Sequence, residues 1–507
     1  MNTTISPINS VEYEFVLEVP ASELTPYIEN KLRQVGKKAS MPGFRPGKMP
    51  KQLVKKIYGE AAAFEVVDKL VKDTFEDEVL GDPKYKQFGT PKMTTFEYED
   101  GKDLRAVIQF GVRPVFELTS LDGVEISRLV NPVTPEDVKG TIDALLFRRS
   151  TLQDSDAPVA EKSIVIADMV ELDNETKEVM DGGTQEKSAT IVMNDPNLLP
   201  EFLTALMGKN VGDVVEVVVS HEVPHGDHTH KHTHSWQVTL VKIQERIYPE
   251  LNDDFAKEVS SGKIETLQEL EIVIEKDLVE QREKRSNEMF ENKLVSKVLE
   301  LNTFEVPSLV VENMLDIMVE THKKEQKKKS PNALDSFDEA QYRSSQYKSA
   351  YQTSRWFVLR DKIIEAQNLE ITEEDFVAYY DEMAKDFGFI DGPSLREIFE
   401  SNQEISYRQE TDSKILSGKV IDFLTNQVHV VEKSRADFDK ESIDEDLDHL
   451  KSTEAEISAK LAEMEASNAD EGVISDLVED LDNIRSQMAE LSQERAELEE
   501  PSETKPE

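Results

Sequence analysis

The sequence predicts a multidomain α+β protein with an N-terminal α+β domain, an inserted β domain, an all-α C-terminal body and an added acidic coiled-coil hairpin. Three observations support this. The 507 residues are enough for several domains with their own cores. Alternation of apolar and charged residues, typical of half-buried strands, occurs near the N-terminus and again between residues 163 and 245. Apolar residues at helical spacing occupy most of the remaining chain.

Composition and the N-terminus argue against several classes of protein. The chain has no cysteine, which argues against a disulfide-stapled secreted protein and fits a reducing, cytoplasmic location. The first residues, MNTTISPINSVEYEF, lack the parts of a signal peptide, and no apolar run is long enough to span a membrane. The excess of 103 acidic over 59 basic residues argues against DNA as a partner of the whole molecule.

Residues 1–118 are expected to form the first domain, with helices packed on an antiparallel sheet. The segment VEYEFVLEV alternates as a strand should, and later segments repeat the pattern. The expected elements are a strand at 11–19, a helix at 61–79 and strands at 94–98 and 104–112.

The most informative stretch of this domain is the basic window, residues 31–58. It contains nine Lys or Arg and no Asp or Glu, within a chain of net charge -44. At its centre, GFRPGKMP at 43–50 is too rich in Gly and Pro for a helix or a strand, so a stiff loop between two helices is expected. Such a loop presents Phe44 and several cations at a low ordering cost, and its natural counterpart is a phosphate-rich surface.

The loop sequence resembles the ribosome-docking signature G-F-R-x-G-K-x-P of the trigger factors, bacterial chaperones that act at the ribosomal exit tunnel. The resemblance implies contact with protein and rRNA of the large ribosomal subunit, and access to nascent, unfolded polypeptides. The residues that fill the fixed positions of the signature are Gly43, Phe44, Arg45, Gly47, Lys48 and Pro50. Pro46 departs from the basic or polar residue common in the family, which removes a cation and adds stiffness. The simpler alternative is a solvated basic loop.

Residues 119–158 are interpreted as a connector with one amphipathic helix. A cap at 131–137 precedes a narrow apolar stripe of Val138, Ile142, Leu145 and Leu146. RPVFEL at 113–118, just before it, is similar to the family's V-x-P-x-x-E-L. The resemblance implies a linker helix that packs on the C-terminal body.

Residues 159–245 resemble the FKBP-like prolyl isomerase domain of the family, with four strands around one short helix at 201–207. Rotamase chemistry requires an apolar, aromatic-walled pocket that favours the twisted X-Pro amide. The resemblance places Leu199, Phe202 and Trp236 in such a pocket, but Asp168 and Ala189 stand where aromatic residues are expected. Two interpretations stay open: a working isomerase, or a β domain that has kept its core and lost catalysis.

Six of the nine histidines lie between His221 and His234. The spacing of two in His228, His230, His232 and His234 would place four imidazoles on one face of a strand, where they could bind Zn or Ni. No cysteine and no fixed tetrahedral pattern supports a metal, so none is assigned, nor any cofactor. A solvated, mobile flap that titrates near about pH 6.5 is the simpler interpretation.

Residues 246–433 are predicted to be helical throughout. YPELNDDF at 248–255 and FEVPSLV at 304–310 resemble family motifs L-P-E-L-x-x-x-F and I-x-V-P-x-x-L. A Leu, Met and Val stripe favours client-binding arms, since methionine repacks at low cost, although plain interhelical core explains at least half of it. The stripe comprises Leu309, Val310, Met314, Leu315, Ile317 and Met318. The nearby lysine cluster at 323–329 is interpreted as a solvated helix end.

Residues 434–507 lie outside the resemblance and carry 24 acidic and 7 basic residues. Two coiled-coil seams, at 443–464 and 474–498, flank the breaker SNADEG. They predict an antiparallel hairpin, or a helix pair that forms a homodimer. One hypothesis is that this acidic hairpin mimics nucleic acid and folds back on the basic window; a solubilising or dimerising appendage is the plainer alternative.

The sequence therefore predicts a ribosome-associated chaperone that binds nascent chains and assists their folding and export. It is expected to act without ATP, since there is no G-x-x-x-x-G-K-[ST] loop. The alternatives are an enzyme whose main task is prolyl isomerisation and an acidic coiled-coil adaptor whose basic loop is incidental.

Overall fold

The computed structural model describes residues 1–39, 44, 48–174, 176–180, 182–225, 228–330, 334, 337–388, 390–401, 405–467 and 471–499, without the side chains of 221–232, 386–387, 405–407 and 471. The chain divides into two compact units, each described by itself below. The first unit comprises Met1–Val130 and Ser286–Glu507, and the second comprises Asn131–Arg285.

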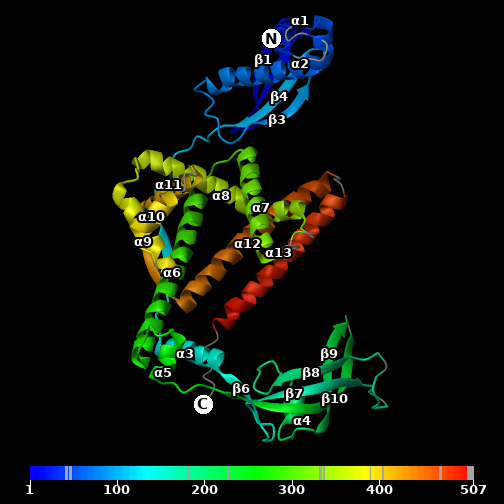
Figure 1. Cartoon of the computed structure of the whole chain (residues 1–507), viewed down its shortest axis with the longest axis vertical. Coiled ribbons are helices and arrows are strands. Elements are labelled where there is room, and N and C mark those ends of the chain that lie inside the picture. The colour runs from blue at the N-terminus through cyan, green and yellow to red at the C-terminus, as the bar shows by residue number, and fades with distance from the viewer. Residues whose placement is uncertain are drawn as a thin grey trace. The chain divides into compact units, whose positions relative to one another are not determined.

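The first unit begins with a four-stranded antiparallel sheet of order β1-β2-β4-β3, covered on one face by two helices (Figure 1). Apolar residues of β2 and β4 that alternate toward this face form the core with one stripe of each helix. The elements are β1 (Asn2–Pro7), β2 (Glu12–Val19), α1 (Ala21–Lys38), α2 (Lys51–Phe75), a π-helical turn (Glu76–Leu80), β3 (Lys92–Glu97) and β4 (Leu104–Gly111). The predicted strands agree. The helix expected directly after the loop and the helix expected at 61–79 form one continuous helix, α2, and β1 was not predicted.

The helical body of the first unit is built around one large core. Buried residues of α6, α7, α8 and α11 meet there, together with Ile126. The helices are α6 (Leu267–Leu301), which begins in the second unit, α7 (Ser308–Lys329), α8 (Glu339–Gln367), α9 (Glu373–Phe387), α10 (Gly392–Ser401) and α11 (Ile405–Thr425). None of the described helices has an apolar stretch long enough to cross a membrane.

A parallel strand pair corrects the expectation that 246–433 is helical throughout. β11 (His429–Ser434) pairs with β5 (Glu125–Val130), a strand inside the predicted connector. The half-buried Val430 and Val431 of β11 lie beside Ile126 and Ser127 of β5. Apolar β-branched residues suit such a pleated, half-buried surface.

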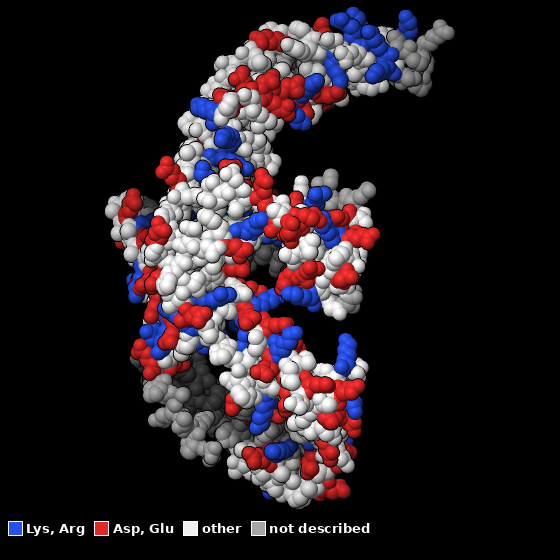
Figure 2. All heavy atoms as spheres, turned by 90° about the vertical axis from the view of Figure 1, so that its left-hand side faces the viewer, with Lys and Arg blue, Asp and Glu red and all other residues white. Residues whose placement is uncertain are grey.

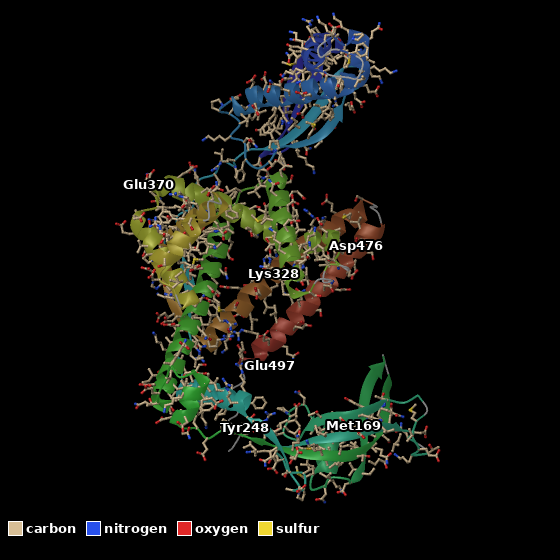
Figure 3. The ribbon with its side chains drawn as sticks, viewed as in Figure 1. Met169, Tyr248, Lys328, Glu370, Asp476 and Glu497 are labelled. Atoms are coloured by element: carbon tan, nitrogen blue, oxygen red, sulfur yellow. The ribbon has the colours of Figure 1, made fainter. Side chains whose placement is uncertain are left out.

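Two long helices follow β11 and contact each other: α12 (Arg435–Ala466) and α13 (Glu471–Glu497) (Figure 1). Arg485 pairs with Glu454 and Arg495 with Asp444, so the two helices run antiparallel. In both predicted seams, the residues that recur at spacings of three and four, such as Ile443, Leu447 and Leu481, are buried or half-buried. Figure 3 marks α13 with Asp476 and Glu497.

The second unit contains a five-stranded sheet of order β6-β10-β7-β8, with β9 paired to the outer part of β10. One short helix, α4, packs on the sheet, and Met169 of β7 lies against this core (Figure 3). The elements are β6 (Thr151–Asp154), β7 (Ser163–Leu172), β8 (Gln185–Val192), α4 (Pro200–Leu206), β9 (Val214–His225) and β10 (His228–Ile247). The loop-like flap expected around the histidines is therefore wrong for the described backbone, which is a strand hairpin.

The second unit also holds the connector helix α3 (Pro135–Arg149) and the short helix α5 (Asp253–Val259). Thr134 and Asp137 form a capping box at the start of α3. Ile142 of α3 is buried with residues of α5 and of the first turns of α6, which include Phe255 and Leu270. The narrow apolar stripe of α3 is thereby covered.

Candidate functional site

The basic window forms a tip in which α1 and α2 meet through a small core of their own. Ala39, Met49 and Val54 are buried there, and Leu32, Leu53 and Tyr58 pack around them. Pro50 caps α2, and its carbonyl accepts the Leu53 and Val54 amides, each at 3.0 Å. The two ends of the loop are therefore fixed by packing and by helix capping.

Phe44 lies at the surface of this tip, with 40% of its area exposed. Lys48 and Pro50 are also exposed, whereas Met49 between them is buried at 8%. An exposed aromatic side chain next to a fixed backbone is a common feature of binding surfaces. The predicted site residues Gly43, Arg45 and Gly47 lie outside the described residues.

The cations of the tip divide into two groups. Lys31 forms an ion pair with Glu65, and Lys55 lies 3.3 Å from Asp100. Within the part of the chain that is described, the other cations of the window form no ion pair and are exposed. These are Arg33, Lys37, Lys38, Lys48, Lys51 and Lys56. Figure 2 shows Lys and Arg gathered at one end of the N-terminal domain.

Among the described residues, the acidic hairpin α12–α13 forms no ion pair with these cations. Its described ion pairs lie within the hairpin or reach Lys293 of α6 and Lys433 of β11. The hypothesis that the hairpin folds back on the basic window therefore has no support among the described contacts.

The tip core is a feature that the sequence interpretation missed. Ala39, Met49 and Val54 stand inside a window selected for its charge, and only their apolar character distinguishes them. Gly36 of α1 belongs to the same region, because a Cβ at this position would meet Val54 at 3.5 Å. The helices thus approach closely where the loop begins and ends.

The three predicted prolyl-pocket residues have different environments. Phe202 of α4 is buried at 8% in the core of the β domain, and Trp236 of β10 is half-buried against the same core. Leu199 is 45% exposed at the N-cap of α4. The structure therefore places the two aromatic residues in one apolar cluster, and Leu199 does not belong to it.

The two departures from an aromatic wall are also visible. Asp168 accepts a hydrogen bond from the backbone N–H of Ser188 at 2.9 Å, across a register shift between β7 and β8. Ala189 is buried next to Ala167. A carboxylate and a methyl group therefore stand at the positions where the resemblance implies aromatic rings.

One histidine of the β domain has a described carboxylate partner. His234 Nδ1 lies 2.9 Å from Glu171 Oε1, and the Thr184 backbone N–H donates to Oε2 of the same carboxylate at 3.0 Å. The Thr184 amide, and then His234, hold the pKa of Glu171 below its usual value. No group of three metal-ligating side chains occurs among the residues whose side chains are described.

Comparison with known proteins gives two family matches. Residues 1–145 match the family described as bacterial trigger factor protein (TF), and residues 266–426 match the bacterial trigger factor protein (TF) C-terminus. The trigger factor of Salinibacter ruber (strain DSM 13855 / M31) is 32% identical over 449 residues, which cover 86% of this chain and 96% of that protein. The chain belongs to the trigger factor family.

Other relatives agree. The trigger factor of Geotalea daltonii (strain DSM 22248 / JCM 15807 / FRC-32) is 27% identical over 87% of this chain and 100% of its own length. A solved structure titled "Promiscuous Substrate Recognition in Folding and Assembly Activities of the Trigger Factor Chaperone" covers 84% of this chain and 99% of its own, at 19% identity and a TM-score of 0.42. As a trigger factor, the chain is a ribosome-associated chaperone. The second family match ends at residue 426, before β11 and the acidic hairpin.

Proposed function

We propose that the chain docks on the large ribosomal subunit near the exit tunnel through the α1–α2 tip, residues 31–58. The observation that carries this proposal is that the tip exposes both Phe44 and six cations without a described carboxylate partner. In a chain of net charge -44, such a group contrasts with the rest of the molecule. Gly43, Phe44, Arg45, Gly47, Lys48 and Pro50 are the proposed docking residues.

The physical basis is a combination of charge and preorganisation. Cations that approach rRNA phosphates release condensed counterions, which makes the affinity strongly dependent on salt. The buried Met49 and the Pro50 cap hold the loop ends in place before docking, so less conformational entropy is lost. Phe44 supplies an apolar contact on a ribosomal protein or a base.

Nascent polypeptides are the proposed clients of the helical body, in the cytoplasm and without ATP. Of the predicted stripe, Leu309 and Leu315 are buried core residues, whereas Ile317 is 59% exposed. Tyr347 of α8 and Ile398 of α10 are exposed as well. We propose these exposed apolar side chains as contacts for unfolded segments.

The docking proposal is tested with matched pairs of lysines. Replacing Lys37 and Lys38 by Ala removes two exposed tip cations and should weaken ribosome cosedimentation at low salt by about tenfold or more, since each phosphate contact contributes to the salt-dependent affinity. The control replaces Lys327 and Lys328 at the end of α7, which removes the same charge elsewhere. Equal binding by the two double variants would contradict docking through the tip.

A second candidate function is prolyl isomerisation by the β domain. It is favoured by the shared apolar cluster of Phe202 and Trp236. The full chain should accelerate a proline-limited refolding reaction, and Trp236→Ala should reduce this acceleration while the client remains bound. If the acceleration is absent, or unchanged in the variant, the domain has kept its core without catalysis.

A further inference from the structure

The backbone of the β9–β10 hairpin brings all six clustered histidines together. Twelve register pairs join the two strands without a break, from His228 opposite His225 to Thr239 opposite Val214. His221 lies opposite His232 in the same ladder. His221 of β9 and His232 of β10 are thus direct cross-strand neighbours.

The register places the six residues on one face of the hairpin. Residues directly opposite each other in an antiparallel pair share a face, and so do residues two apart on one strand. His228, His230, His232 and His234 are two apart on β10, and His221 and His225 oppose two of them. The sequence spacing indicated only the four histidines of β10; the cross-strand register adds the other two.

The spacing of this face suits a transition-metal ion. Opposite residues have Cα atoms about 4.5–5.5 Å apart, and residues two apart on a strand are about 6.5–7 Å apart. His221 and His232 make one three-histidine set with His234, the next histidine on β10. His225 and His228 make another with His230. Neutral imidazole suits Zn²⁺, Ni²⁺ and Cu²⁺, and three such ligands with one open position form a known type of zinc site.

A second observation comes from the base of the hairpin, where His234 is bonded to Glu171. Nδ1 of His234 lies 2.9 Å from Oε1 of this carboxylate, which orients the imidazole ring. Metal-binding histidines characteristically donate their other N–H to a carboxylate in this way. The Thr184 amide holds the Glu171 carboxylate in turn.

We propose that the histidine face of the β9–β10 hairpin binds one or two divalent transition-metal ions of the Zn²⁺ or Ni²⁺ class. β10 pairs with β7 only from Ser235 onward, so the outer hairpin is a two-stranded ribbon that an ion would cross-link. Two-stranded ribbons are marginally stable alone. The same face of β10 continues into half-buried Trp236 and buried Val238, so metal binding would stiffen the segment next to the proposed prolyl pocket.

The test measures binding of ZnCl₂ and NiCl₂ to the chelator-treated full chain by titration calorimetry. The unmodified protein should bind one or two ions. His221→Gln should weaken binding by about tenfold or more, as His232→Gln does, because both belong to one cross-strand set; Glu171→Gln should weaken it by roughly tenfold through His234. The matched control, His322→Gln with His429→Gln and His449→Gln, removes the three histidines outside the hairpin and should leave the affinity unchanged.

Two results would overturn the proposal. One is the absence of measurable binding of ZnCl₂ or NiCl₂ by the unmodified protein. The other is binding that is unchanged in His221→Gln, which would mean that the run 228–234 chelates as a linear segment without the cross-strand partner.

Discussion

Replacing Phe438 by Ala should release the acidic hairpin from the helical body. Phe438 lies in the first turn of α12 and is 1% exposed, and the Lys293 ammonium lies 4.7 Å from its ring centre. Lys293 also lies 2.8 Å from Glu445 and 3.3 Å from Glu441. The aromatic ring and this lysine thus connect α12 to α6.

The magnitude follows from the burial. Truncating a fully buried Phe costs about 3–5 kcal/mol through lost apolar contact and the cavity left behind. Because about 1.4 kcal/mol is a factor of ten, local opening should become roughly a hundredfold to a few thousandfold more frequent.

Native-state hydrogen exchange of β11 measures this effect, because β11 pairs with β5 of the body and continues directly into α12, so release of α12 should make opening of the pair more frequent. The control is Val478→Ala on α13, a residue of the same hairpin that is 42% exposed, which should change exchange little. Exchange of β11 in Phe438→Ala within about threefold of the unmodified protein would refute Phe438 as the anchor, because an anchoring ring should contribute kilocalories.

Three further predictions concern single residues. The pKa of Asp137 is lowered to about 2, first by the Thr134 backbone N–H and then by Arg282. The ionised carboxylate therefore stabilises α3 fully above its usual pKa of 3.8, and this stabilisation is lost as the pH falls through about 2. Asp137→Asn should remove this pH dependence from the hydrogen exchange of the α3 amides. Gly36→Ala should leave ribosome binding intact and raise the stability of α1 by about 0.5–1 kcal/mol in thermal denaturation, because the added Cβ meets Val54 only at van der Waals distance and alanine favours helix. A clash that lowers stability would contradict the described approach of the helices. Met49→Ala should destabilise the tip by about 2–5 kcal/mol and speed exchange at the start of α2; unchanged exchange there would show that the tip core is unimportant.

Local patterns in the sequence predicted much of the fold. The alternation at 11–19 and 104–112 agrees with β2 and β4, and the cap before Pro135 agrees with the start of α3. In these segments a single buried face determines the pattern, so the period of apolar residues is sufficient. The exposure of Phe44 between Gly and Arg was likewise anticipated.

Contacts between distant segments were not predictable in the same way. β11 was assigned to a helix because HVVEKS is too short to show a period, and its partner β5 lies hundreds of residues earlier in the chain. The partnership of His221 with His232 depends on the register of a hairpin, which no spacing within one strand contains. The tip core was missed because three apolar residues in a strongly charged window carry no pattern of their own.

The central claim, that the α1–α2 tip holds the chain on the ribosome, is tested most directly by pelleting the full chain with purified ribosomes over a range of salt concentrations. The unmodified protein should cosediment at low salt and dissociate steadily as salt increases, whereas the variant carrying Phe44→Ala and Arg45→Ala should fail to cosediment while keeping its circular dichroism spectrum. Normal cosedimentation of the folded double variant would contradict the account.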